Sequence, residues 1–148
     1  MVNDTLILLK GIIGESIKVH LSLARDLPEI MADMNQLKQV CINIIMNAIE
    51  AMHNQGDLWV STHYLKDVGL HDMISIRVKD SGEGIKTEHL RKIFQPFFST
   101  KEKGGGMGLS ICERIIQNHS GFIKVTSTRG QGTEFDIRIP IKQDAEKV

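Results

Sequence analysis

The longest regular pattern of apolar positions in the chain runs from Leu37 to Met52. Apolar or small residues recur every three or four positions, which is the spacing of one helical face turned toward a core; they are residues 37, 40, 41, 44, 45, 48, 51 and 52. At about 100° per residue, the polar side chains along one edge of that face form a stripe, made of Gln39, Asn43, Asn47 and Glu50. Taken alone, this pattern predicts a surface helix with polar residues on its solvent-exposed side.

The other apolar patterns are shorter and mostly alternate with period two. Strict alternation predicts a half-buried strand over 17–23. Further strands are expected over 58–64, 73–78, 122–127 and 133–140, and Glu29–Ala32 could add a brief strand. Short helices are expected over apolar residues between Leu6 and Ile13, capped by Asn3–Thr5, and over 87–93. A further helix is expected from Leu109 to about His119, where Gly121 follows as a usual stop residue.

The order of these elements predicts the fold class. Most strands follow one another as hairpins, with helices inserted between them, which favours an α+β two-layer sandwich. We expect a mixed, mostly antiparallel sheet with helices on one face. The pattern shows neither an internal repeat nor an interdomain linker. It predicts one domain over residues 1–141 and a polar C-terminal tail over 142–148.

Composition excludes several classes of protein. The 148 residues carry 18 basic and 18 acidic side chains, and this balance argues against a nucleic-acid-binding or membrane-binding surface. The apolar runs are too short to span a bilayer, and no signal peptide is apparent. Cys41 and Cys112 lie far apart in helical patterns and are expected to be buried, reduced thiols. The six histidines lack metal-ligand spacing.

Asp80, Gly82 and Gly84 form the first candidate site, at the end of a predicted strand. A carboxylate there can accept a hydrogen bond from an exocyclic amine, and glycines allow a flat ring to approach the backbone. Acidic residues followed by glycines are common in ordinary turns. The motif therefore needs support from other parts of the chain.

Four glycines between Gly104 and Gly108 precede the predicted helix that starts at Leu109. Backbone amides at a helix N-terminus can hold phosphate oxygens, although a flexible loop explains the composition equally well. The loop is not a Walker motif, since no Gly-Lys-Ser/Thr closes it. A dinucleotide-binding βαβ unit is absent as well.

The segment between the two glycine motifs carries apolar and basic residues. It contains three of the five phenylalanines of the chain, Phe94, Phe97 and Phe98, and its last part carries the cations Lys101 and Lys103. Apolar anchors beside a glycine hinge are typical of a lid that closes over a ligand. A core cluster with solvated lysines is the simpler alternative.

Taken in order, these motifs resemble the ATP-binding catalytic domain of sensor histidine kinases. The matching residues are Asn43 and Asn47, then Asp80, Gly82 and Gly84, then Phe94, Phe97 and Phe98, then Gly104, Gly106 and Gly108, and finally Gly130, Gly132 and Thr133. The resemblance covers about Leu37 to Ile139. The wider group is the Bergerat fold, which also includes gyrase B-type topoisomerases, heat-shock chaperones and mismatch-repair proteins.

The resemblance implies a role for individual residues. Asn47 would ligate Mg2+, Asn43 would orient phosphate or metal-bound water, and Asp80 would bind the adenine amino group. Lys101 would hold phosphates, and with the two asparagines would form the catalytic set. The complete set implied for ATP or ADP binding is Asn47, Asp80, Gly82, Gly84, Ile85, Phe94, Phe98, Lys101, Gly104, Gly106, Met107, Gly108, Leu109 and Thr133.

Asn43 decides between branches of this group. Hydrolytic members have a glutamate at that position, and a carboxylate can activate water as a general base whereas an amide cannot. The sequence therefore predicts a protein kinase that holds ATP–Mg2+ until an outside nucleophile arrives, and not a dedicated ATPase.

The chain lacks the phosphoacceptor motif of histidine kinases. The resemblance implies that the acceptor histidine lies on a separate helical-hairpin domain, that a response regulator follows, and that this fragment alone does not autophosphorylate. We expect a cytoplasmic, monomeric fragment without direct membrane contact, cut from a kinase that could be membrane-anchored, or acting in trans. Two alternatives remain: a serine kinase of the anti-sigma-factor type, or a nucleotide-binding module without activity.

Overall fold

The structure is a computed structural model that describes residues 1–68, 71–98 and 108–141. Its elements follow one another along the chain as α1 (Val2–Leu9), β1 (Ile17–Ser22), α2 (Met34–Ala51), β2 (Gly56–Val68), β3 (His71–Asp80), α3 (Thr87–Leu90), α4 (Gly108–Asn118), β4 (Phe122–Thr128) and β5 (Gly132–Pro140). The predicted tail over 142–148 lies outside the described residues.

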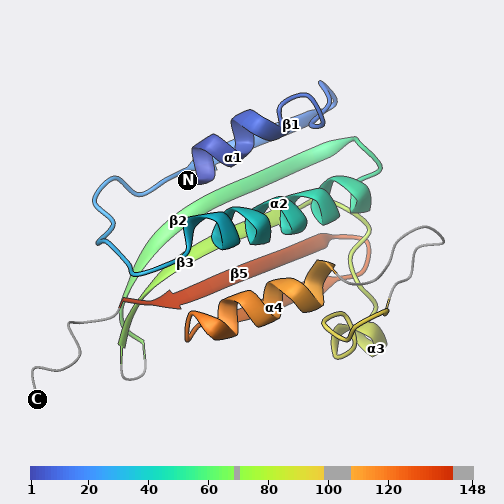
Figure 1. Ribbon diagram of the computed structural model, residues 1–148. Coiled ribbons are helices and arrows are strands. Elements are labelled where there is room, and N and C mark those ends of the chain that lie inside the picture. Colours follow the sequence, from blue (N-terminus) through green and yellow to red (C-terminus); the bar gives the residue numbers. More distant parts are fainter. Residues whose placement is uncertain (69–70, 99–107, 142–148) are drawn as a thin grey trace, which may run out of the picture.

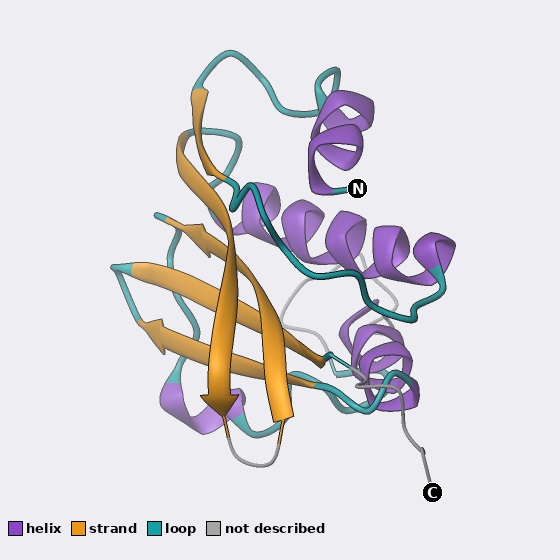
Figure 2. Cartoon of the chain, turned by 90° about the vertical axis from the view of Figure 1, so that its left-hand side faces the viewer, coloured by secondary structure: helices purple, strands orange, loops and turns teal. Residues whose placement is uncertain are grey.

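The five strands form one mixed sheet in the order β1-β2-β3-β5-β4 (Figure 1). β1 runs parallel to β2, and every other neighbouring pair is antiparallel. Figure 2 shows α1, α2 and α4 on the same face of this sheet. The structure therefore confirms the predicted α+β sandwich with a mostly antiparallel sheet and one helical layer.

The central helix α2 starts three residues earlier than its apolar pattern, at Met34, because Asp33 caps it. The Asp33 carboxylate accepts a hydrogen bond from the backbone N–H of Gln36 at 3.1 Å, which satisfies one of the free donors of the first turn. The apolar face predicted from the sequence is buried at Leu37, Val40, Cys41, Ile44, Ile45, Ala48 and Ile49. This face packs on the sheet and fixes the position of the polar stripe.

Three predictions for the first third of the chain need correction. The N-terminal helix was expected over the apolar residues between Leu6 and Ile13, but it spans Val2–Leu9. Its buried face consists of Val2, Thr5 and Leu9. β1 is not half-buried: it lies at the sheet edge, and only Ile17 is buried. The brief strand expected over 29–32 is absent, and that segment has no regular structure.

His119 connects the end of α4 to the start of α2. Its Nδ1 donates to the carbonyl of Ile115 at 2.8 Å, and its Nε2 accepts from the backbone N–H of Asp33 at 3.0 Å. A neutral imidazole provides one donor and one acceptor, so both ring nitrogens are used. The sequence had suggested only a residue at a helix end.

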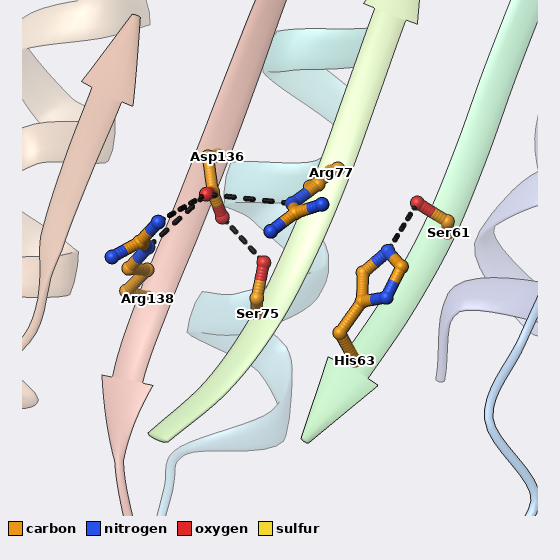
Figure 3. Close-up of polar contacts among 6 residues, drawn as sticks. All are labelled: Ser61, His63, Ser75, Arg77, Asp136 and Arg138. Carbon is orange, nitrogen blue, oxygen red and sulfur yellow. Dashed lines mark hydrogen bonds and ion pairs between the residues drawn. The ribbon is translucent and has the colours of Figure 1, made fainter. Parts of the chain in front are cut away.

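The face of the sheet opposite the helices carries polar side chains (Figure 3). Asp136 lies at its centre and is 5% exposed. Its carboxylate accepts hydrogen bonds from Ser75 and Arg138 and forms an ion pair with Arg77 at 3.5 Å. The buried charge is therefore compensated by Ser75 and Arg77 on the neighbouring strand β3 and by Arg138 on β5 itself.

No helix within the described parts of the chain combines the length and apolar character needed to cross a bilayer.

Replacing Asp136 by alanine should destabilise the protein. The substitution would leave the buried hydroxyl of Ser75 and the guanidinium of Arg138 without their acceptor, and Arg77 without its ion-pair partner. We expect a cost of about 1–3 kcal/mol. Urea unfolding would measure the loss, with Asp26→Ala at an exposed loop acid as the control. Equal stabilities of the two variants would contradict this role of Asp136.

Candidate functional site

Asp80 is the one acidic residue of the predicted site, and its side chain is buried. It is the last residue of β3 and is only 2% exposed. One carboxylate oxygen accepts a hydrogen bond from the backbone N–H of Gly82 at 2.8 Å, and the backbone of Thr133 donates a second one. The turn after β3 and the start of β5 thus each donate one hydrogen bond to the carboxylate.

Burial raises the pKa of Asp80 above its usual range, and the hydrogen bonds from Gly82 and Thr133 oppose this rise. Among the described residues, no lysine, arginine or histidine forms an ion pair with this carboxylate. Buried carboxylates usually have a charged partner. Asp80 is therefore suited to accept a hydrogen bond from a ligand.

The segment after Asp80 approaches two other elements more closely than any side chain would allow. A Cβ on Gly82 would lie 2.6 Å from the carbonyl oxygen of Ala51, at the end of α2. A Cβ on Gly84, whose φ is +74°, would lie 2.3 Å from the carbonyl oxygen of Thr128. The sequence had assigned these glycines to the approach of a ligand ring, but their spacing also serves the protein's own packing.

Ser127 organises this region, and the sequence analysis missed it. Its hydroxyl accepts from the backbone N–H of Ile85 at 2.8 Å and lies 2.8 Å from the hydroxyl of Thr133. It also donates to the carbonyl of Gly132 at 3.1 Å. Ser127 therefore ties the loop after β3 to the β4–β5 turn. A serine within an alternating strand gives no sequence signal for such a role, because its partners are distant along the chain.

Asn43 and Asn47 both lie on the half-buried edge of α2. The side-chain nitrogen of Asn43 donates to the sulfur of Cys112 on α4 at 3.7 Å. A Cβ on Gly108, the first residue of α4, would lie 4.0 Å from the amide carbon of Asn43. The structure therefore brings the asparagine edge of α2 to the N-terminal end of α4, as phosphate binding at that end would require.

The other predicted residues divide into two groups. Ile85, Phe94, Phe98 and Leu109 are partly buried and pack against the core, whereas Phe97 is 79% exposed with a φ of +64°. Phe98 meets the ring of His89 edge-on at 5.5 Å. The predicted residues Lys101, Gly104, Gly106 and Met107 lie outside the described residues.

The side-chain oxygens of Asp80, Asn43 and Asn47 suit a nucleotide and a hard cation with few protein ligands. Asp80 uses only part of the acceptor capacity of a carboxylate, which can accept about four hydrogen bonds. Amide oxygens such as those of Asn43 and Asn47 are among the oxygen ligands of Mg2+, which usually keeps water and substrate phosphates as its other ligands. Within the described ranges, no three His, Cys, Asp or Glu residues cluster as a metal site.

Residues 32–143 match the family model described as histidine kinase-, DNA gyrase B- and HSP90-like ATPase. The match covers most of the chain, and it includes the Asn43, Asp80 and Thr133 regions described above. The chain therefore belongs to this family of nucleotide-binding ATPases and kinases.

Solved structures and curated relatives place the similarity among histidine kinases. The catalytic domain of histidine kinase ThkA is 32% identical with a TM-score of 0.80, and the match covers 94% of this chain and 89% of that one. Full-length ShkA in complex with AMPPNP is 25% identical with a TM-score of 0.83, covering 99% of this chain and 30% of that one.

Two sporulation kinases of Bacillus subtilis (strain 168) are similar in sequence. Sporulation kinase E is 40% identical over 99% of this chain, and sporulation kinase C is 48% identical over 78%. The chain spans only 20% and 26% of their lengths. The similarity is therefore confined to a part of each of these longer kinases.

The raised pKa of Asp80 predicts how stability without nucleotide depends on pH. An unfolded aspartate titrates near pH 3.9, whereas the folded state keeps the Asp80 proton to a higher pH. Stability gained at low pH is then lost as pH rises through the folded pKa. Urea unfolding at several pH values should show the parent losing free energy of unfolding relative to Asp80→Asn above about pH 4. A constant difference between the two proteins would contradict this prediction.

Proposed function

We propose that this chain binds ATP–Mg2+ and donates the γ-phosphoryl group to a histidine on a separate phosphoacceptor domain. The observation that carries the proposal is the buried carboxylate of Asp80, which retains acceptor capacity and has no cationic partner within the described residues. The amino group of adenine is a donor of the right chemistry for it. Membership of a nucleotide-binding family supports the same assignment.

In this proposal, three parts of the fold hold three parts of the nucleotide. Asp80 and Thr133 bind the adenine side, where Ser127 keeps their segments together. Asn47 ligates Mg2+, and Asn43 orients phosphate or a metal-bound water. The start of α4 at Gly108 and Leu109, with Lys101 and the preceding glycines, holds the phosphates. Ile85, Phe94, Phe98 and Met107 complete the nucleotide pocket.

The amide of Asn43 supports transfer to a protein over hydrolysis. An uncharged amide cannot remove a proton from water, so bound ATP would persist until the acceptor histidine reaches the γ-phosphorus. The histidine nitrogen then forms a bond to phosphorus as the bond to the β-phosphate oxygen breaks and ADP leaves. Catalysis would come from positioning and from stabilisation of charge on the phosphoryl oxygens.

The proposal also defines the partners of the fragment. The phosphohistidine would form on a helical hairpin and pass its phosphoryl group to a response regulator. Sensor histidine kinases such as ZraS are among the sequence relatives, and this supports a place in two-component signalling. We include in the proposal a cytoplasmic location for this fragment, and a monomeric state in isolation.

The fragment should bind ATP or ADP, and Asp80→Asn should weaken that binding about tenfold or more. In the variant, an NH2 donor replaces one oxygen of the buried carboxylate and would face the adenine amine, which is also a donor. The hydrogen bond to a charged group that is then lost contributes about 1.5–3 kcal/mol. Isothermal titration calorimetry would measure both affinities. Thr87→Ala, at an exposed position on α3, is the control and should bind as the parent does. A folded parent that binds no nucleotide would overturn the proposal.

The fragment should not become labelled when incubated alone with γ-labelled ATP, because the described part of the chain contains no phosphoacceptor hairpin. Adding a purified phosphoacceptor domain of a related kinase should yield phosphohistidine, which is lost in acid and retained in base. An acid-stable phosphate on a protein partner would support the serine-kinase alternative. Nucleotide binding without transfer to any supplied domain would support a binding module.

A further inference from the structure

Cys112 lies between two polar groups of α2, although it belongs to α4. Its sulfur accepts a hydrogen bond from the side-chain nitrogen of Asn43 at 3.7 Å. Its thiol donates to the backbone carbonyl of Val40 at 3.9 Å. Cys112 is fully buried, so water cannot replace either contact.

The protonation state of the Cys112 thiol determines whether it can bind the NH2 end or the oxygen end of the Asn43 amide. Burial raises the pKa of Cys112 to about 11, with the hydrogen bond from Asn43 opposing the rise, so the thiol keeps its proton near neutral pH. Since that proton points to the carbonyl of Val40, the sulfur is left as an acceptor. An acceptor binds the NH2 end of an amide and not its oxygen.

We propose that Cys112 is a positioning residue for Asn43, and that it directs the amide oxygen of Asn43 to the ligand. The inference rests on the proposed function and, within it, on an Mg2+-bound water as the partner of Asn43, because a phosphate oxygen would instead accept from the amide nitrogen. A metal-bound water is a hydrogen-bond donor, so it needs the amide oxygen as its acceptor. With the Asn43 nitrogen engaged by sulfur, the rotamer that offers oxygen is favoured before the nucleotide arrives.

Cys41 provides a matched comparison. It is also buried, at 2% exposure, and it lies on α2 near Cys112. Burial raises its pKa to about 12, with a smaller contribution from the neighbouring Cys112. Substituting Cys41 changes packing in the same interface while it leaves the Asn43–Cys112 hydrogen bond in place. Packing alone and positioning therefore predict different results for the two cysteines.

The experiment compares four variants with the parent chain: Cys112→Val and Cys112→Ala, which remove the acceptor, Cys112→Ser, which retains one, and Cys41→Val. Calorimetric titration with ATP would be run with Mg2+ and again with EDTA. We expect Cys112→Val and Cys112→Ala to lose about three- to tenfold in affinity for ATP–Mg2+, equivalent to one weak hydrogen bond. Affinity without Mg2+ should stay within twofold. Cys112→Ser and Cys41→Val should match the parent in both conditions.

A second readout tests the contact without nucleotide. The side-chain amide signals of Asn43 in an ¹⁵N–¹H spectrum, assigned with Asn43→Asp, should shift in Cys112→Val and Cys112→Ala more than in Cys41→Val. If the parent binds ATP and the Cys112 variants bind it equally well with Mg2+, the inference is wrong and the proposed function stands. If the folded parent binds no nucleotide, the proposed function fails, and the role of Cys112 fails with it.

Discussion

The candidate site depends on a buried carboxylate that, among the residues the structure describes, is held by backbone amides and not by a cation. Asp80 can occupy this place because β3 ends beside the start of β5, so that Gly82 and Thr133 supply donors from two segments. Desolvation of the carboxylate opposes folding, and tight local packing must offset it. The segment after Asp80 is accordingly pinned at several points: the N–H of Glu83 donates to the carbonyl of Ala51 at 3.1 Å, and the N–H of Gly130 donates to the carbonyl of Glu83 at 2.7 Å.

The helix α2 connects this carboxylate to the opposite end of the site. Its apolar face packs on the sheet through residues such as Ile44 and Ile45, which leaves the polar edge no freedom to rotate. Ala51 at the end of α2 contacts the segment after Asp80, while Asn43, two turns earlier, contacts α4. One rigid helix therefore sets the separation between the proposed base-binding end and the proposed phosphate-binding end, which would preorganise a ligand site.

Several errors of the sequence analysis have a common physical cause. β1 alternates as a half-buried strand would, yet its edge position leaves Val19 and Leu21 40% and 45% exposed. The N-terminal helix follows the residues that pack on α2, with Thr5 among them, so apolar character alone misplaced its start. The period of the apolar pattern indicates whether a segment is a helix or a strand, but its burial depends on which neighbouring element covers it. Local sequence contains no information about that neighbour.

The amino-acid sequence by itself determined the element types, the α+β class, the amphipathic helix and the order of the site motifs, since periodicity, turn chemistry and residue spacing are local properties. It also identified Asn43, Asp80 and Thr133 as candidates. Only the tertiary structure revealed that Ser127 joins the loop after β3 to the β4–β5 turn, that His119 connects α4 to α2, and that Cys112 contacts Asn43. These contacts join residues far apart in the chain, and their existence depends on strand order and helix packing, which no local pattern encodes.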